Sequence, residues 1–114
     1  KWDCIHYQNK AISLCSHGMQ KRTALALATI HNPELLILDE PFSGLDLYHT
    51  KILQSYLLER KKNKMSTLIS SHIMPYIIEL CDYVYIFKNQ KIKKIEEWNY
   101  SNQIERKKII DQII

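Results

Sequence analysis

The chain has 114 residues, of which 46% are hydrophobic and 25% charged, and these ordinary globular values exclude a disordered or membrane-embedded chain. A chain of this length forms one domain with a single modest core at most. The net charge is +4, and its densest basic cluster indicates a solvated helix end at Arg60, Lys61, Lys62 and Lys64.

The first predicted elements are a helix and a strand. The helix covers residues 19–30, with Ser16 as its N-cap and the breaker Asn32-Pro33 after its end. The continuous apolar run 35–38 then ends in two carboxylates, which is typical of a strand buried on both faces of a parallel sheet.

A second helix, strand and helix follow. Residues 47–62 have apolar positions at helical spacing and a basic C-terminal end, so we expect an amphipathic helix there. Residues 65–69 predict a second buried strand. Pro75 is suited to the first turn of a short helix that reaches Cys81.

The C-terminal part reads as a hairpin and a helical tail. Residues 83–87 and 92–95 predict two strands joined at Asn89-Gln90, and residues 102–114 have helical apolar spacing. The whole order predicts an α/β fold in which parallel strands alternate with helices and polar residues collect at the strand C-termini.

Two adjacent carboxylates close the first apolar strand. In the segment LLILDE, Asp39 can hold the hydration shell of Mg²⁺ and Glu40 can reach an attacking water, as in the Walker-B arrangement of P-loop proteins. A surface Asp-Glu pair at the end of a strand is the alternative for this fragment taken alone.

The segment Pro41–Asp46 follows without a gap and resembles the D-loop of ABC ATPases. In that family the loop is a sharp turn that carries its aspartate towards the partner subunit. The four candidate residues are Ser43, Gly44, Leu45 and Asp46. A common Ser-Gly turn, with Asp46 as the cap of the next helix, is an alternative that is compatible with the first reading.

The segment CSHGMQKR resembles the ABC signature motif. In the family the serine hydroxyl, the glycine backbone and the helix N-terminus contact the terminal phosphate of ATP bound to the opposite subunit. The candidate contacts are Ser16, His17, Gly18, Met19 and Gln20. The segment departs from the commonest form at Cys15, at His17, which replaces a glycine, and at Met19, which is familiar among exporter-type ATPases.

A histidine follows the second strand. His72 comes after Ser70 and Ser71 and resembles the switch histidine that bonds the terminal phosphate and orients the catalytic water and glutamate. A structural or solvated histidine is the alternative. The remaining histidines have no metal-ligand spacing and are interpreted as ordinary polar residues: His6, His31 and His49.

Together these segments resemble the ATP-binding subunit of an ABC transporter from the signature motif onward. The resemblance implies a partial P-loop NTPase fold, with residues 1–98 as the C-terminal part of the nucleotide-binding domain and residues 99–114 as a helical tail. The chain contains no GxxxxGK[ST] motif, and the glutamine loop is also missing. The start at Lys1 favours a fragment, which we expect to be inactive by itself.

For the complete domain, the resemblance implies ATP and Mg²⁺ as cofactors. It implies a second ATP-binding subunit and transmembrane permease subunits as partners, at the cytoplasmic face of the membrane, with export as the direction of transport. Nucleic acid is not expected, because no basic face interleaved with aromatic residues can be identified. The three cysteines form no CxxC pair, which fits a reducing cytosol: Cys4, Cys15 and Cys81.

Two alternatives remain open. The chain can be a catalytically inert partner that lends its signature and D-loop to another ATPase. It can also belong to a non-transport ABC ATPase that acts on DNA or ribosomes, although the compact spacing of its motifs is unlike the interrupted or extended form usual in those branches.

Overall fold

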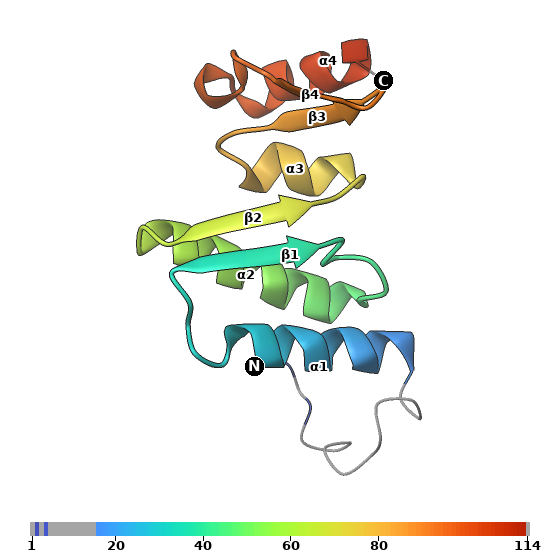
Figure 1. Cartoon of the computed structure of the whole chain (residues 1–114), viewed down its shortest axis with the longest axis vertical. Coiled ribbons are helices and arrows are strands. Elements are labelled where there is room, and N and C mark those ends of the chain that lie inside the picture. Colours follow the sequence, from blue (N-terminus) through green and yellow to red (C-terminus); the bar gives the residue numbers. More distant parts are fainter. Residues whose placement is uncertain (1, 3, 5–15, 114) are drawn as a thin grey trace. The chain divides into compact units, whose positions relative to one another are not determined.

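A computed structural model describes Trp2, Cys4 and residues 16–113 (Figure 1). The chain divides into two compact units, Lys1–His72 and Ile73–Ile114. In chain order the elements are α1 (His17–Thr29), β1 (Leu35–Asp39), α2 (Leu47–Lys62), β2 (Ser66–Ser70), α3 (Met74–Leu80), β3 (Tyr85–Lys88), β4 (Lys91–Lys94), the 3-10 helix η3 (Trp98–Tyr100) and α4 (Gln103–Ile113).

The first unit is built on a parallel strand pair. β1 and β2 run in register from Leu35 opposite Ser66 to Asp39 opposite Ser70, with α2 as the crossover between them. A parallel pair needs such a crossover, and α2 lies alongside the strands (Figure 1). The predicted alternation of parallel strands with helices is confirmed.

Side-chain caps set the starts of the two long helices. The Oγ of Ser16 accepts a hydrogen bond from the amide of Met19 at 3.2 Å, so α1 begins at His17, two residues before its predicted start. The Oδ1 of Asp46 accepts from the amide of His49 at 2.8 Å and begins α2 at the predicted position. β2 begins one residue later than predicted.

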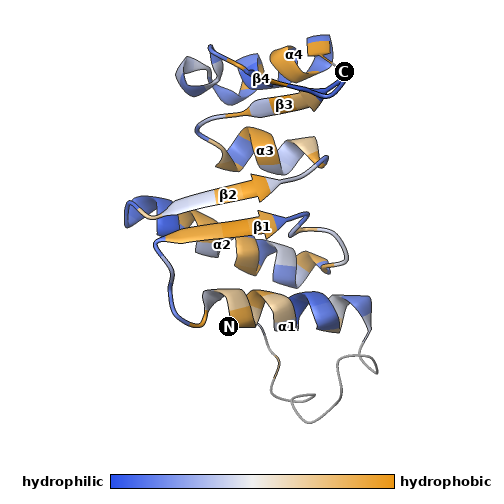
Figure 2. Ribbon diagram, in the orientation of Figure 1, coloured by the Kyte–Doolittle hydropathy of each residue, from blue (hydrophilic) through white to orange (hydrophobic). Residues whose placement is uncertain are grey.

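The strand pair is buried on one face only. Leu36 and Leu38 are 3% and 8% exposed, whereas Leu35 and Ile37 are 58% and 65% exposed, although all four are hydrophobic (Figure 2). Leu68 on β2 is also exposed. The prediction of strands buried on both faces is therefore wrong for the described residues. These residues form a two-stranded sheet and cover only one face of it.

The basic end of α2 is only partly solvated. Lys61, Lys62 and Lys64 are exposed as expected, but Arg60 is buried, with 2% of its surface exposed. Its guanidinium donates hydrogen bonds of 2.7 Å to the carbonyl of Pro33 and 2.7 Å to that of Ser66. A third bond, of 3.0 Å, runs from its Nε to the hydroxyl of Thr67. Spacing alone could not distinguish this arginine from its lysine neighbours.

The second unit has its own core around Trp98, whose side chain is fully buried. The buried residues packed with it are Ile77, Val84, Ile95 and Ile110. The indole Nε1 donates to the carbonyl of Cys81 at 3.0 Å. Arg106 of α4 donates to the carbonyls of Trp98 and Ile78 at 3.1 and 2.9 Å, which fastens the C-terminal helix to this core.

The short elements of the second unit follow their local sequence. Proline stands in the first turn of α3, as predicted. β3 and β4 pair antiparallel, and the two residues between them, Asn89 and Gln90, have φ of 53° and 60°. Two successive left-handed residues make a type I′ turn, so the predicted hairpin is confirmed. The short helix η3 was not anticipated from the sequence.

None of the helices in the described part of the chain is long and apolar enough to cross a membrane. The longest of them, α2, has 16 residues and carries basic side chains in its last turn.

Replacing Arg60 with methionine should destabilise the protein strongly. The carbonyls of Pro33 and Ser66 would lose their bond to the guanidinium, and a buried carbonyl left without a donor costs about 1–3 kcal/mol. We expect a loss of roughly 2–4 kcal/mol for Arg60→Met in urea denaturation, against less than about 0.5 kcal/mol for Lys62→Met in the same helix turn. Equal losses for the two variants would contradict the role assigned to Arg60.

Candidate functional site

The carboxyl ends of β1 and β2 meet through their last residues. Asp39 lies opposite Ser70 in the strand register, and the Ser70 hydroxyl donates a hydrogen bond to the Asp39 carboxylate. The amide of the next residue, Glu40, donates to the carbonyl of Ser70 at 2.9 Å. Pairing therefore continues one residue beyond β1 and fixes where Glu40 leaves the sheet.

Glu40 and His72 come together at this edge. The Nδ1 of His72 lies 2.7 Å from Oε1 of Glu40, although the two residues are 32 positions apart in the chain. The His72 side chain is 81% exposed and that of Glu40 33% exposed, so the pair is open to solvent. The two residues predicted from the sequence as a catalytic pair thus do lie within hydrogen-bonding distance.

Glu40 has two further unusual features. Its φ of 47° is in the left-handed region, which a residue with a side chain rarely adopts. Its second oxygen, Oε2, is shielded from solvent and has no hydrogen-bond partner among the described residues. A buried polar atom without a partner is an exception in folded proteins and often marks a functional position.

A compact turn connects Glu40 with Asp46. The amide of Ser43 donates to the carbonyl of Glu40 at 3.2 Å, and the amide of Leu45 donates to that of Phe42 at 3.4 Å. Gly44 has a φ of 79°. The segment predicted as a D-loop is therefore a sharp turn that ends at the cap of α2, so the two readings of Asp46 are compatible.

The N-terminus of α1 contacts this turn. A Cβ added at Gly18 would lie 3.0 Å from the carbonyl oxygen of Gly44, and one added at Gly44 would lie 2.1 Å from Cδ2 of His17. The ring of His17 therefore covers the Cα of Gly44. Met19 and Gln20 complete the first turn of α1 by donating their amides to Ser16. Cys15 lies outside the described residues.

A lysine that the sequence analysis did not single out also reaches the site. The Nζ of Lys21 on α1 donates to the carbonyl oxygen of Glu40 at 2.9 Å. That carbonyl also accepts from Ser43, so the backbone of Glu40 is held from two directions. Lys21 belongs to the segment CSHGMQKR, but the resemblance of that segment gave no reason to expect a contact with Glu40.

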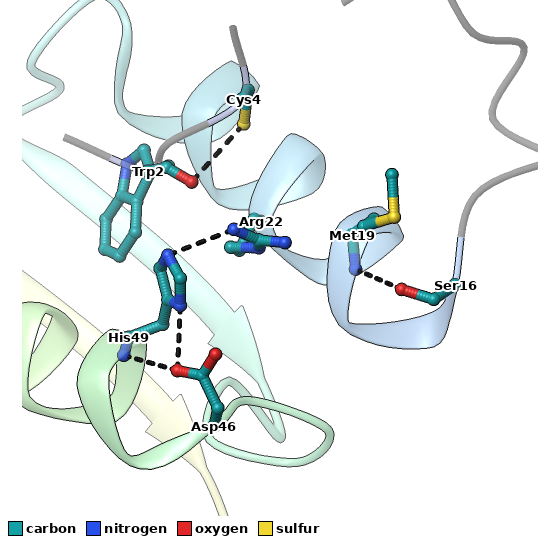
Figure 3. A network of polar contacts seen from close by, with 7 residues as sticks. All are labelled: Trp2, Cys4, Ser16, Met19, Arg22, Asp46 and His49. Carbon is teal, nitrogen blue, oxygen red and sulfur yellow. Dashed lines mark hydrogen bonds and ion pairs between the residues drawn. The ribbon is translucent and has the colours of Figure 1, made fainter. Parts of the chain in front are cut away.

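His49, which the sequence analysis interpreted as an ordinary polar residue, has a specific buried position. Its side chain is buried between α1 and the turn, with Nδ1 2.8 Å from Oδ1 of Asp46 and Nε2 3.1 Å from an Arg22 nitrogen (Figure 3). The hydrogen bonds from the amide and the ring of His49 lower the pKa of the Asp46 carboxyl. Its place three residues after a capping aspartate is the signal that could have revealed it. His6 lies outside the described residues.

The carboxylates at this edge suit a loosely held cation. The described residues contain no group of three or more histidine, cysteine or acidic side chains that could enclose a metal. Mg²⁺ usually keeps several waters and takes one or two carboxylates plus substrate phosphates. The exposed carboxylate of Asp39 fits that mode, because it stands at a strand end beside Glu40.

Comparison with known proteins gives consistent matches. The family model described as ABC transporter matches residues 2–43. The uncharacterized ABC transporter ATP-binding protein YhaQ of Bacillus subtilis is 38% identical over 91 residues, which make up 80% of this chain and 30% of that protein. The lantibiotic transport ATP-binding protein SrtF of Streptococcus pyogenes is 36% identical over 90 residues, which make up 79% of this chain and 39% of that protein.

A solved structure has the same fold. It is that of MJ1267, an ATP-binding cassette of an ABC transporter, with a TM-score of 0.61, 21% identity and coverage of 96% of this chain and 44% of that one. The α/β prediction of an ABC ATPase fold is thereby confirmed. The chain spans 30% of YhaQ and 39% of SrtF. Together the matches support an ABC transporter nucleotide-binding domain.

The contact between His17 and Gly44 predicts a specific coupling. Gly44→Ala should destabilise the protein by about 1–2 kcal/mol, because alanine is strained at a φ of 79° and its Cβ would meet the His17 ring. The double variant His17→Gly/Gly44→Ala should be less destabilised than the sum of the two single variants, since the ring contact is removed while the φ strain remains. Additive losses in urea denaturation would show that His17 and Gly44 do not interact.

Proposed function

We propose that the chain is the signature and hydrolytic part of an ATP-binding ABC transporter subunit of export type, coupling ATP hydrolysis to transport through separate membrane subunits. Glu40 is its general base and His72 the residue that orients Glu40. The 2.7 Å hydrogen bond between these two side chains carries the proposal, because it joins the two predicted catalytic residues at one sheet edge.

The geometry of Glu40 supports this role. Its Oε1 is engaged by His72, while Oε2 has no hydrogen-bond partner among the described residues, so that oxygen is not committed to another group. The backbone amide of Glu40 is bound to Ser70, and its carbonyl is bound by Lys21. The carboxylate therefore has few directions in which to move, and a base gains from being held in position before the reaction.

The other candidate residues serve the nucleotide and the partner subunit. The N-terminus of α1 would bind the terminal phosphate of ATP held by the opposite subunit, because the helix dipole favours an anion there. The side chains proposed for that site are Ser16, His17, Gly18, Met19 and Gln20. The turn of Ser43, Gly44 and Leu45 presents Asp46 towards the same partner.

Asp39 would hold Mg²⁺ through water when ATP is bound. The chemistry that the ion would supply there is positive charge that offsets the negative charge developing during phosphoryl transfer. Ser70 donates a hydrogen bond to Asp39 and thereby orients that carboxylate within the strand edge. The adjacent Glu40 remains available for the proton.

The proposed partners are a second ATP-binding subunit and transmembrane permease subunits, which would keep the protein at the cytoplasmic face of the membrane. Methionine at position 19 of the signature-like segment favours an exporter. SrtF is a lantibiotic transport ATP-binding protein, and its similarity to this chain supports the same general activity.

A second candidate function has one specific observation in its favour. The sequence contains no GxxxxGK[ST] phosphate cradle. A chain without this cradle can still lend its α1 and its D-loop turn to the nucleotide site of another subunit. In that case the chain is a regulatory or dimerisation partner without hydrolysis of its own.

Hydrolysis can be tested in a chimera in which this chain replaces the matching part of YhaQ. The chain alone should release no phosphate from Mg-ATP, whereas the chimera should do so. Glu40→Gln should lower kcat by about 10²–10⁴-fold, as expected when a general base is removed. The control Glu34→Gln changes an exposed carboxylate just before the opposite end of β1 and should leave kcat within about twofold. An active Glu40→Gln chimera would exclude Glu40 as the base.

The partner function predicts that ATP hydrolysis depends on Ser16 of this chain and not on Glu40. When the chain is mixed with full-length YhaQ, it should stimulate ATP hydrolysis at a shared site, and Ser16→Ala should remove that stimulation by deleting the hydroxyl at the α1 N-terminus. Glu40→Gln should leave it intact, because Glu40 would face the site that has no cradle. Steady-state phosphate release measures both. Absence of stimulation at every ratio of the two proteins would reject the partner function.

A further inference from the structure

The buried histidine of α2 lies between two segments that the proposed function treats separately. His49 is 4% exposed and touches Arg22 on α1 with one ring nitrogen and Asp46 at the end of the turn with the other (Figure 3). The ring of Tyr48 stands edge-on to it, with the centroids 5.0 Å apart. This arrangement fills a buried position with a polar ring although an apolar one would be cheaper to bury.

The two contacts determine which nitrogen carries the proton. A guanidinium has only donors, so Nε2 of His49 must accept from Arg22. The proton then belongs on Nδ1, from which it is donated to Oδ1 of Asp46 at 2.8 Å. One neutral tautomer satisfies both neighbours. The doubly protonated ring would turn an N–H towards the guanidinium and lose that bond.

Two different groups of His49 donate hydrogen bonds to Asp46. Its Oδ1 accepts the backbone amide of His49 at 2.8 Å as well as the ring N–H. Because the amide belongs to the first turn of α2, it fixes Asp46 relative to α2 alone. The ring is what extends the connection to α1, through Arg22.

We propose that His49 is a positioning residue that ties Asp46 to α1 as its Nδ1–H tautomer, so that a displacement of α1 moves Asp46. The consequence for hydrolysis rests on the proposed function. There, α1 would engage the nucleotide of one shared site while Asp46 faces the partner subunit. His49 would pass a displacement of α1 caused by that nucleotide on to Asp46.

The connection is distinct from the other contacts between α1 and the turn, which are made by His17 and Gly18 at Gly44 and by Lys21 at Glu40. Lys21 is the neighbour of Arg22 on α1, but its Nζ binds the carbonyl of Glu40, six residues before Asp46. A substitution of Lys21 should therefore perturb Glu40, and a substitution of Arg22 should perturb Asp46. The two adjacent residues provide a matched pair for the test.

Nuclear magnetic resonance of the whole chain tests the tautomer without ATP or any substitution. In ¹⁵N-labelled protein, the His49 ring should show a protonated Nδ1 and an unprotonated Nε2. The reverse assignment would overturn the proposal, because Nε2–H cannot accept from Arg22. This measurement does not depend on whether the protein hydrolyses ATP.

The transmission is tested with variants in the same measurement. Arg22→Lys should shift the Asp46 carboxyl and amide resonances, and Lys21→Met should shift those of Glu40 and Ser43 instead. In the His49→Asn background, the asparagine amide can still donate to Asp46 but does not reach Arg22, so Arg22→Lys should leave Asp46 unchanged. An equal shift of Asp46 in both backgrounds would show that the signal bypasses His49 and would overturn the proposal.

Discussion

The buried guanidinium of Arg60 is the contact on which the first unit depends. It lies in the last turn of α2 and donates hydrogen bonds to the backbone carbonyls of Pro33 and Ser66, near the N-terminal ends of the two strands. A planar group with five donors in fixed directions can satisfy several acceptors at once, which a lysine ammonium does less specifically. The crossover helix is thereby fastened where β1 and β2 begin, and the alignment of the strands follows from there.

That alignment determines the chemistry at the other end of the strands. With Leu35 opposite Ser66, Asp39 stands opposite Ser70 four residues later, and the side chains that follow the two strands meet. A slip of one residue would send every side chain of one strand to the other face. Glu40 and His72 thus lie together because the register of β1 and β2 is fixed at the opposite ends of these strands.

Most secondary structure could be predicted from local signals. Ser16 and Asp46 cap helices in the expected places, and the hairpin turn at Asn89 and Gln90 has the left-handed backbone that its strands require. The order of strand ends was sufficient to bring Glu40 and His72 together, because parallel strands place their C-termini at one edge.

What could not be predicted depends on contacts distant in the sequence. Arg60 sits in a run of lysines, and only the folded backbone shows that carbonyls from two strands converge on it. His49 lacks metal-ligand spacing, and its partner Arg22 is 27 residues away. The apolar run of β1 indicated burial, but sequence cannot say which layers are present to cover its two faces.

The backbone of Glu40 has an evolutionary consequence. At a φ of 47°, the backbone of glycine or asparagine would be less strained than that of a glutamate. The strain of a non-glycine residue there costs of order 1 kcal/mol of folding stability. Substitution by glycine or asparagine at this position would therefore tend to increase stability as it removed the carboxylate. Persistence of glutamate in such a place is expected only while its carboxylate is under selection, so the residue at position 40 in natural variants of this chain would record whether that selection is still acting.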